Sequence, residues 1–308
     1  MNRSTWIAAS AVTVLGAFAS TSPAQTLSVL DVAYAGSMGS MMEGPIKSAA
    51  ASALGVDMHG RAQGSDALAK LIVGGSINAD VFIPVTPGPA MTVLKAGKAQ
   101  TAVPIARTEM VIAYSPKSKY AQQFADAASG KRGAMPWYQI LQQPGVRFGR
   151  TDPMTDPQGR NIIYTLQLAE MYYKQPGLAQ KILGDTLNTA QIFAEPTVEA
   201  RLQSGELDAA SAYKIQPGPF NIPYINLPDA INLGNQSMHD RYQQATLTLG
   251  DKTSHPEALV YYAAAISGSA HADKSAAFVR WLSSAGGQAI FRQYAYDSPV
   301  GAVALSER

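Results

Sequence analysis

The first part of the chain repeats one alternation, in which an apolar run of strand length is followed by a helix-prone run. Strands are predicted at 27–35, 56–62 and 79–84, and the helices between them at 38–53 and 66–73. Parallel strands can be joined only by a crossover connection, and a helix is the usual one. This order therefore predicts an α/β fold, with a parallel sheet and helices on both of its faces.

Two long extended segments divide the chain further along. Residues 105–115 form an apolar strand of unusual length, and 211–226 end in a proline-rich stretch that reads as an extended return crossing. Two crossings between two bodies give two lobes, a two-strand hinge and a cleft that closes around a ligand. We expect one lobe to comprise 25–111 plus 218–308 and the other to comprise 112–217.

The composition excludes several classes of function. The 308 residues have a formal charge of +2, from 24 basic and 22 acidic side chains, so no general field attracts nucleic acid or an anionic membrane. The chain has no cysteine, which excludes thiolate metal sites and cysteine nucleophiles. It also has no nucleophile elbow and no phosphate loop of the GxxxxGK type. We expect a binding protein that is not an enzyme and has no nucleic-acid partner.

Residues 1–24 have the layout of a secretory signal peptide. Arg3 supplies a positive start, and 6–18 supply an apolar core that is too short for a stable membrane anchor. Small residues at Ser22 and Ala24 favour cleavage after Ala24. A lipoprotein anchor needs a cysteine after the signal, and there is none. We therefore expect a soluble periplasmic protein that is not a lipoprotein and acts as a monomer.

Polar residues occupy the turns where the predicted strands lead into helices. Ser37, Ser65, Asp156 and Glu195 stand at four such turns, and Tyr213 ends a short strand. Ligands of open α/β sheets bind at the carboxyl ends of the strands, and helix N-termini there offer free N–H groups to anions. Each serine taken singly is an ordinary helix cap. Together the turns predict an anion site that needs no lysine or arginine.

The stretch from Glu195 to Tyr213 is the most informative of these. Pro196 fits the first helical position, which predicts Glu195 as the N-cap beside the positive end of the helix dipole. Gly205 ends this helix, and residues 207–213 read as a small-residue strand. The chain thus turns back and brings an acid and a phenol toward the same cleft.

The acidic residues at an anion site need an explanation. A carboxylate in a dry cleft repels an oxyanion by several kcal/mol at an effective dielectric of about 20. Asp156 and Glu195 therefore either only cap helices or bond to something positive. A hexavalent metal at the centre of an oxyanion is such a partner, whereas sulfate and phosphate cannot expand their coordination in this way.

Longer stretches of the chain resemble the archaeal-type tungstate- and molybdate-binding proteins of ABC transporters, a family of periplasmic solute-binding proteins. The matching stretches are AYAGSMGSMMEG, AQGSDALAKLI, NADVF, RTEMVIAYSPKSKY, WYQILQQPGVRFGRTDPMTDPQGRN, LAEMYY, RLQSGELDAASAYK and YINLPDAINLG. They cover most of residues 30–235 in the family's order. The resemblance implies a type II periplasmic-binding-protein fold that captures tungstate or molybdate between its lobes and delivers it to an ABC permease. It implies no cofactor besides this ligand.

The resemblance also implies which residues bind the ligand. Two serines donate to the oxyanion, two acids complete a six-oxygen shell around molybdenum or tungsten, a tyrosine adds a hydrogen bond and two residues contribute backbone contacts. Carried over by position, these are Ser37 and Ser65, Asp156 and Glu195, Tyr213, and Pro157 and Gln158.

Some alternatives stay open at this point. Glu199 is the alternative to Glu195, because the segment before Glu195 is shorter than in the archaeal proteins, and Asp152 is the alternative to Asp156. Arg150 and Arg160 flank the aspartates and either neutralise them or pair at the surface, which is the commoner use of such residues. The same fold could also bind sulfate, another oxyanion or a small organic anion, or serve as a ligand sensor.

Overall fold

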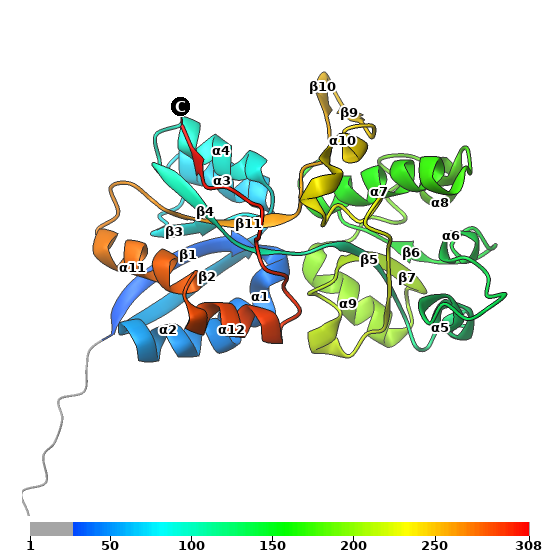
Figure 1. The fold of residues 1–308 in the computed structure, drawn as a ribbon, viewed down its shortest axis with the longest axis horizontal. Coiled ribbons are helices and arrows are strands. Elements are labelled where there is room, and N and C mark those ends of the chain that lie inside the picture. The colour runs from blue at the N-terminus through cyan, green and yellow to red at the C-terminus, as the bar shows by residue number, and fades with distance from the viewer. Residues whose placement is uncertain (1–26, 308) are drawn as a thin grey trace, which may run out of the picture.

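The computed structural model describes residues 27–307, and of Glu195 and Pro196 only the backbone. The predicted signal peptide at 1–24 lies outside the described residues. Within them, two sheets of six and four strands organise two lobes that lie side by side (Figure 1). No helix in the described part of the chain is both long and apolar enough to cross a membrane.

The six-stranded sheet forms the first lobe, in the spatial order β12-β4-β11-β3-β1-β2. β1 pairs in parallel with β2 and β3, but β11 is antiparallel to β3 and β4, and β12 is antiparallel to β4. The predicted parallel pairing is confirmed for β1, β2 and β3, the strands on which it rested, and β11 and β12 add antiparallel strands to the sheet. β4 leads toward the second lobe and β11 returns from it, so these neighbours run in opposite directions. The strands are β1 (Ser28–Ala35), β2 (Val56–Gln63), β3 (Val81–Ile83), β4 (Thr101–Arg107), β11 (Val260–Ala265) and β12 (Leu305–Ser306).

Helices cover both faces of this sheet, as predicted. α3 (Ser65–Val73) and α4 (Pro87–Lys95) lie on one face, and α2 (Lys47–Leu54), α11 (Ala272–Leu282) and α12 (Ala285–Gln293) lie on the other (Figure 1). Side chains along β1 alternate between the two cores, because successive residues of a strand point to opposite faces.

The helix expected over 38–53 is built from several pieces. A 3-10 turn at Gly36–Met38 leads into α1 (Gly39–Met41), a π-helical turn at Met42–Ile46 and then α2. Pro45 lies inside the π-helical turn. Proline cannot donate the hydrogen bond of a regular helix, so the altered turn is where this sequence accommodates it.

The four-stranded sheet of the second lobe has the order β6-β7-β5-β8. Its core helix is α7 (Pro157–Tyr173), whose residues Ile162, Leu166 and Ala169 are fully buried. The other elements are β5 (Met110–Tyr114), β6 (Phe148–Gly149), β7 (Ala209–Tyr213), β8 (Tyr224–Asn226), α5 (Ala121–Ala128), α6 (Trp137–Ile140), α8 (Leu178–Leu183) and α9 (Glu195–Ser204).

The single long strand expected over 105–115 is in fact two strands. β4 ends at Arg107 in the larger sheet, and β5 begins at Met110 in the smaller one. The chain crosses between the lobes at this break, which hydropathy does not reveal because both strands are buried.

Three segments meet at the crossing. The Met110 N–H donates to the Asn232 carbonyl at 2.8 Å, and the Leu259 N–H donates to the Leu233 carbonyl at 3.1 Å. The C-terminal segment also reaches the crossing, because Arg107 and Asp297 each donate a backbone hydrogen bond to the other, at 2.8 and 3.0 Å.

The predicted division into 25–111 plus 218–308 and 112–217 stays a prediction, since membership of a sheet does not fix a lobe boundary. β8 pairs with β5 in the smaller sheet, although it falls within the first of the predicted lobes.

After β8 the chain also forms an arm over the second lobe. The arm consists of a 3-10 turn (Gln236–Met238), α10 (His239–Tyr242) and the hairpin of β9 (Leu247–Leu249) and β10 (Lys252–Ser254). It is held against α7 by a hydrogen bond between the Tyr164 and Ser254 hydroxyls at 2.7 Å and by two between Gln167 and Thr246 at 2.8 and 2.9 Å. The arm, which belongs to the segment that returns to the first lobe, thus packs against α7, the core helix of the second lobe. One further 3-10 turn, at Gly218–Phe220, precedes β8.

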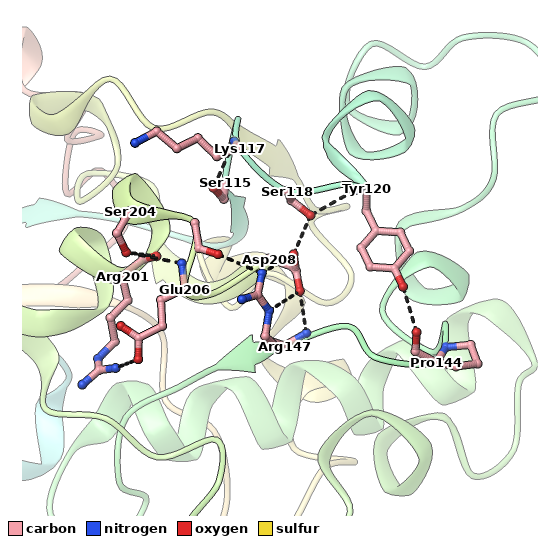
Figure 2. A network of polar contacts seen from close by, with 11 residues as sticks. Ser115, Lys117, Ser118, Tyr120, Pro144, Arg147, Arg201, Ser204, Glu206 and Asp208 are labelled. Carbon is pink, nitrogen blue, oxygen red and sulfur yellow. Dashed lines mark hydrogen bonds and ion pairs between the residues drawn. The ribbon is translucent and has the colours of Figure 1, made fainter.

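A buried carboxylate fixes the start of β7, as Figure 2 shows. Asp208 accepts hydrogen bonds from the Ser118 hydroxyl at 2.7 Å and from the Arg147 backbone N–H, Nε and Nη2 at 2.8, 2.9 and 2.9 Å. Burial alone would raise the pKa of Asp208. The hydrogen bonds from Arg147 and Ser118 outweigh it and hold this pKa below its usual range.

Replacing this carboxylate should destabilise the protein in a pH-dependent way. Asp208→Asn is expected to lower the free energy of unfolding at pH 7 by about 1–3 kcal/mol, because charge-assisted hydrogen bonds are lost. A depressed pKa contributes stability above the unfolded value of about 3.9, and that stability is lost as the pH falls. Urea unfolding should therefore show that the difference in free energy of unfolding between the wild type and Asp208→Asn becomes smaller toward pH 3.

The control for this experiment is Asp126→Asn, which removes a carboxylate paired with Lys131 at the surface. It should leave the unfolding midpoint at pH 7 close to that of the wild type. Equal midpoints for Asp208→Asn and Asp126→Asn would contradict the role given to Asp208.

Candidate functional site

The two lobes enclose a cavity of about 220 Å³ at the carboxyl ends of their strands. The first lobe contributes the turn after β1, with Ser37, and the C-terminal Tyr296. The second lobe contributes Glu199 of α9, and Gln216 and Phe220 of the segment after β7. The cavity therefore lies between the lobes, where a ligand would touch both.

Ser37 is a predicted ligand-binding residue that lines this cavity. Five other predicted residues are not among its lining residues: Ser65, Asp156, Pro157, Gln158 and Tyr213. Its hydroxyl lies 2.9 Å from the hydroxyl of Tyr261, which is fully buried in β11. The side chain of Ser37 is itself half-buried. A buried partner of this kind fixes the direction of the serine hydroxyl before any ligand arrives.

Ser65 begins α3 and is buried beside the end of β3. Its Oγ accepts a hydrogen bond from the Val85 N–H at 3.1 Å, so its proton points elsewhere. Thr86, which follows Val85 in the chain, has φ 73° and ψ 154°, a conformation that is costly for a β-branched side chain. The Thr86 N–H donates to the Val260 carbonyl at 2.9 Å, which helps to hold this turn.

The turn before Ser65 meets the turn before α7. Gly64 lies so close to the second lobe that a Cβ built on it would be 2.8 Å from the Thr155 carbonyl oxygen and 3.8 Å from the Asp156 Cα. Only a residue without a side chain allows this approach. The structure thus brings the predicted site residues Ser65 and Asp156 onto two touching turns.

Asp156 is the N-cap of α7, as its place before Pro157 predicts. Its Oδ1 accepts a hydrogen bond from the Gln158 N–H at 2.8 Å. Burial raises the pKa of Asp156 to about 6, although the Gln158 N–H, Arg160 and Thr151 act in the opposite direction. Most Asp156 side chains are therefore ionised at neutral pH.

Asp152, the alternative to Asp156, has a different local task. Its Oδ1 accepts from the Met154 N–H at 2.8 Å, and its carbonyl accepts from the Asp156 N–H at 2.9 Å. It therefore shapes the turn that presents Asp156.

A buried hydrogen-bond chain links α7 to the end of β7. The Gln158 side chain donates to Gln216 Oε1 at 2.5 Å, and the same oxygen accepts from the Tyr213 N–H at 2.7 Å. Asn161 donates to the Tyr213 hydroxyl at 3.0 Å. The structure thus joins two of the predicted site residues, Gln158 and Tyr213, through residues that the sequence interpretation missed. Asn161 lies one helical turn after Pro157 and so on the same face of the helix, and this spacing could have indicated it as a site residue.

The structure corrects one prediction about α9. Its N-cap is Ala194, which makes no side-chain cap, and Glu195 is already within the helix, so the predicted N-cap role of Glu195 is wrong. Pro196 is favoured in the first turn as a whole, so it cannot fix the cap to a single residue. The side chain of Glu195 lies outside the described residues.

Glu199, the alternative to Glu195, does face the cavity that contains Ser37. Burial raises the pKa of Glu199 to about 7, and its own backbone N–H offsets only part of this effect. A carboxyl group that titrates near neutral pH thus lines the space between the lobes.

The two arginines beside the aspartates have unequal roles. Arg150 is fully buried and donates to the Asp185 and Thr186 carbonyls at 3.1 and 2.7 Å, so the expectation of surface pairing is wrong for it. Arg150 holds the loop that leads to α9. Arg160 forms an ion pair with Asp66 of the opposite lobe.

The structure thus places Ser37 and Glu199 on one interlobe cavity, and Ser65 and Asp156 on two turns that touch between the lobes. In the described part of the chain, no group of three or more histidine, cysteine or acidic residues could hold a free metal ion. The arrangement suits an anion that both lobes touch at once.

A comparison with protein families agrees with this geometry. The family described as bacterial extracellular solute-binding protein matches residues 30–297. The chain belongs to this family. It is a family of solute-binding proteins of transport, not of enzymes.

Curated relatives of this solute-binding protein narrow the resemblance. It is 30% identical over 213 residues to the molybdate/tungstate-binding protein WtpA of Pyrococcus abyssi, covering 62% of this chain and 60% of that one. WtpA of Thermococcus kodakarensis is also 30% identical, with 62% and 58% covered. The chain thus spans about 60% of the length of these relatives. The predicted resemblance to tungstate- and molybdate-binding proteins is confirmed.

Solved structures confirm the two-lobed α/β fold. The periplasmic molybdate-binding protein of Azotobacter vinelandii superposes with a TM-score of 0.62 at 17% identity, covering 88% of this chain and 99% of that one. The sulfate-binding protein SubI of Mycobacterium tuberculosis gives 0.61 at 12% identity, covering 89% and 88%. At these identities the likeness concerns the fold alone. The ligand roles of the predicted site residues stay predictions.

The raised pKa of Glu199 has a measurable consequence for stability. A folded-state pKa of about 7, against about 4.3 unfolded, means that the folded protein holds more protons in this window, so stability falls as the pH rises. Glu199→Gln removes that loss. The variant should exceed the wild type by about 1–3 kcal/mol in free energy of unfolding at pH 8 and match it at pH 4.5. Urea unfolding at both pH values measures the difference.

Glu206→Gln is the matched control, because Glu206 lies at the surface and pairs with Arg201. The control should not gain stability at pH 8. A Glu199→Gln variant that is less stable than the wild type at pH 8 would show that the folded protein stabilises the ionised form of Glu199, which contradicts a raised pKa.

Proposed function

We propose that this solute-binding protein captures tungstate or molybdate between its lobes and delivers it to an ABC permease in the inner membrane. The observation that carries the proposal is the contact between the turn of Ser65 and the turn of Asp156 across the cleft. The names of the relatives as molybdate/tungstate-binding proteins support this choice of cargo. The same proposal places the mature protein in the periplasm as a monomer that catalyses no reaction and binds no nucleic acid.

The chemistry of the site follows from its parts. Hydroxyls of Ser37 and Ser65 donate to the oxyanion, and the N-terminus of α7 adds backbone N–H groups near Pro157 and Gln158. Tyr213 supplies one more hydrogen bond. These donors neutralise a dianion without a full positive charge from the protein, so they do not by themselves distinguish one oxyanion from another.

Selectivity comes from the carboxylates. Asp156, with a pKa of about 6, is ionised at neutral pH and can bond to the hexavalent centre of the cargo. The second carboxylate is Glu195, with Glu199 as its alternative because Glu199 lines the cavity. Either pair of acids repels sulfate, whose centre cannot accept further oxygens.

Calorimetry of the mature protein with tungstate, molybdate, sulfate and phosphate tests the proposal. Tungstate and molybdate should bind at least about 10-fold more tightly than sulfate, which corresponds to about 1.4 kcal/mol. Glu195→Gln should weaken tungstate binding if that carboxylate bonds to the metal. Failure to bind any tetrahedral oxyanion would end the proposal, and a preference for sulfate would favour the alternative cargo on the same fold.

A second experiment probes the contact between the turns. Gly64→Ala is expected to weaken tungstate binding by about 10-fold or more, because the new Cβ would strike the Thr155 carbonyl as the lobes close. The backbone of Gly64, with φ −53° and ψ 131°, suits any residue, so the substitution acts only through the contact between the lobes. The thermal midpoint of the ligand-free protein should fall little, because that protein can relieve the contact by opening.

Gly44→Ala is the control for Gly64→Ala, since a Cβ there meets nothing within 4 Å. It should bind tungstate like the wild type. If Gly64→Ala also binds like the wild type, the two turns do not meet in the loaded protein.

A further inference from the structure

An ion pair crosses the cleft beside the proposed site. Arg160 Nη2 contacts the Asp66 carboxylate, which belongs to the opposite lobe. Asp66 directly follows Ser65 in the first turn of α3, and Arg160 stands one helical turn after Asp156 in α7. The pair therefore joins the two helices whose N-termini form the proposed site.

Arg160 is also anchored within its own lobe. Its Nη1 donates to the Pro153 carbonyl at 3.2 Å, so the guanidinium is held by the turn of Asp156 while it reaches across the cleft. A guanidinium with two fixed contacts loses less entropy when it pairs than a free side chain does.

The position of this pair distinguishes it from the other ion pairs of the described residues. Those others lie within one lobe or, in the case of Lys214 with Glu109 and Asp297, at the hinge. The contact between Asp66 and Arg160 instead joins α3 of the first lobe directly to α7 of the second. Opening would separate its two charges.

The ion pair of Asp66 and Arg160 is partly buried, which affects how strongly its two charges attract each other. Its side chains are 31% and 21% exposed for Asp66 and Arg160. They line an interlobe cavity of about 520 Å³, together with Lys70, Tyr164, Lys252 and Glu257. A half-buried pair is screened less than one at the surface and avoids the desolvation cost of full burial.

We propose that Asp66 and Arg160 form a latch that holds the lobes closed over the bound oxyanion and so sets how long the cargo stays bound. The inference rests on the proposed function. Neither residue is assigned a contact with the ligand, and both act through the turns of Ser65 and Asp156.

The two halves of the latch should not be equivalent. Arg160 lowers the pKa of Asp156 and Asp66 raises it, so the arginine also compensates the carboxylate at the site. Loss of Asp66 removes the latch but keeps this cation beside the cleft. Loss of Arg160 removes both the latch and the cation that attracts an incoming dianion.

Stopped-flow measurements with tungstate separate these effects. Asp66→Asn should raise the dissociation rate constant about 3-fold to 10-fold and leave the association rate constant within about 2-fold. Arg160→Gln should raise dissociation similarly and also slow association. Exchange of the two charges in Asp66→Arg with Arg160→Asp should bring dissociation back toward the wild-type value. The effect of Asp66→Asn should shrink at 1 M salt, where charges are screened within about 3 Å.

The control is Asp126→Asn, which breaks the exposed pair with Lys131 inside the second lobe and should leave both rate constants unchanged. If the wild type binds tungstate and Asp66→Asn releases it at the wild-type rate, the proposal that Asp66 and Arg160 form a latch is wrong, while the proposed function stands. A charge-exchanged protein that folds, by circular dichroism, but releases tungstate as fast as the single variants also overturns it. A wild type that binds no oxyanion overturns both.

Discussion

Close approach of two backbone turns is the constraint on which the site depends. Gly64 allows the turn before α3 to touch the turn before α7, and any side chain there would hold the lobes apart. The contact places the N-termini of two helices, and with them Ser65 and Asp156, at one point between the lobes. Helix N-termini favour anions only when they lie close to them, so an anion site of this type exists only while the lobes stay together.

Local patterns predicted much of this arrangement. The β-α-β order gave the sheet with helices on both faces, and the place of Asp156 before Pro157 gave its role as N-cap, because both are consequences of neighbouring residues. Long-range features were not accessible in the same way. The break between β4 and β5, the reversed direction of β11 and the full burial of Arg150 are decided by segments that lie far away in the sequence. Gln216 was missed because a glutamine in a proline-rich stretch carries no local sign of burial.

The acids of the cleft differ in how the fold treats them. Asp156 receives a backbone hydrogen bond and lies near an arginine, so burial raises its pKa only to about 6. For Glu199, the one effect among the described residues that opposes burial is its own backbone N–H, and its pKa rises to about 7. Near neutral pH the first is mostly charged and the second is close to half-charged. The charge that Glu199 contributes to the lining of the cavity therefore becomes less negative as the pH falls through neutrality.

The strand order of the larger sheet bears on how the chain acquires its structure. β11 lies between β3 and β4, and Ala264 stands opposite Phe82, so the centre of this sheet cannot be completed until the C-terminal part of the chain is present. The strands of the smaller sheet all come from one continuous stretch, β5 to β8. Pairings between distant segments form slowly, because the loop between them has to close first. During synthesis or translocation the second lobe can thus assemble on its own, whereas the first stays incomplete until nearly the whole polypeptide has emerged.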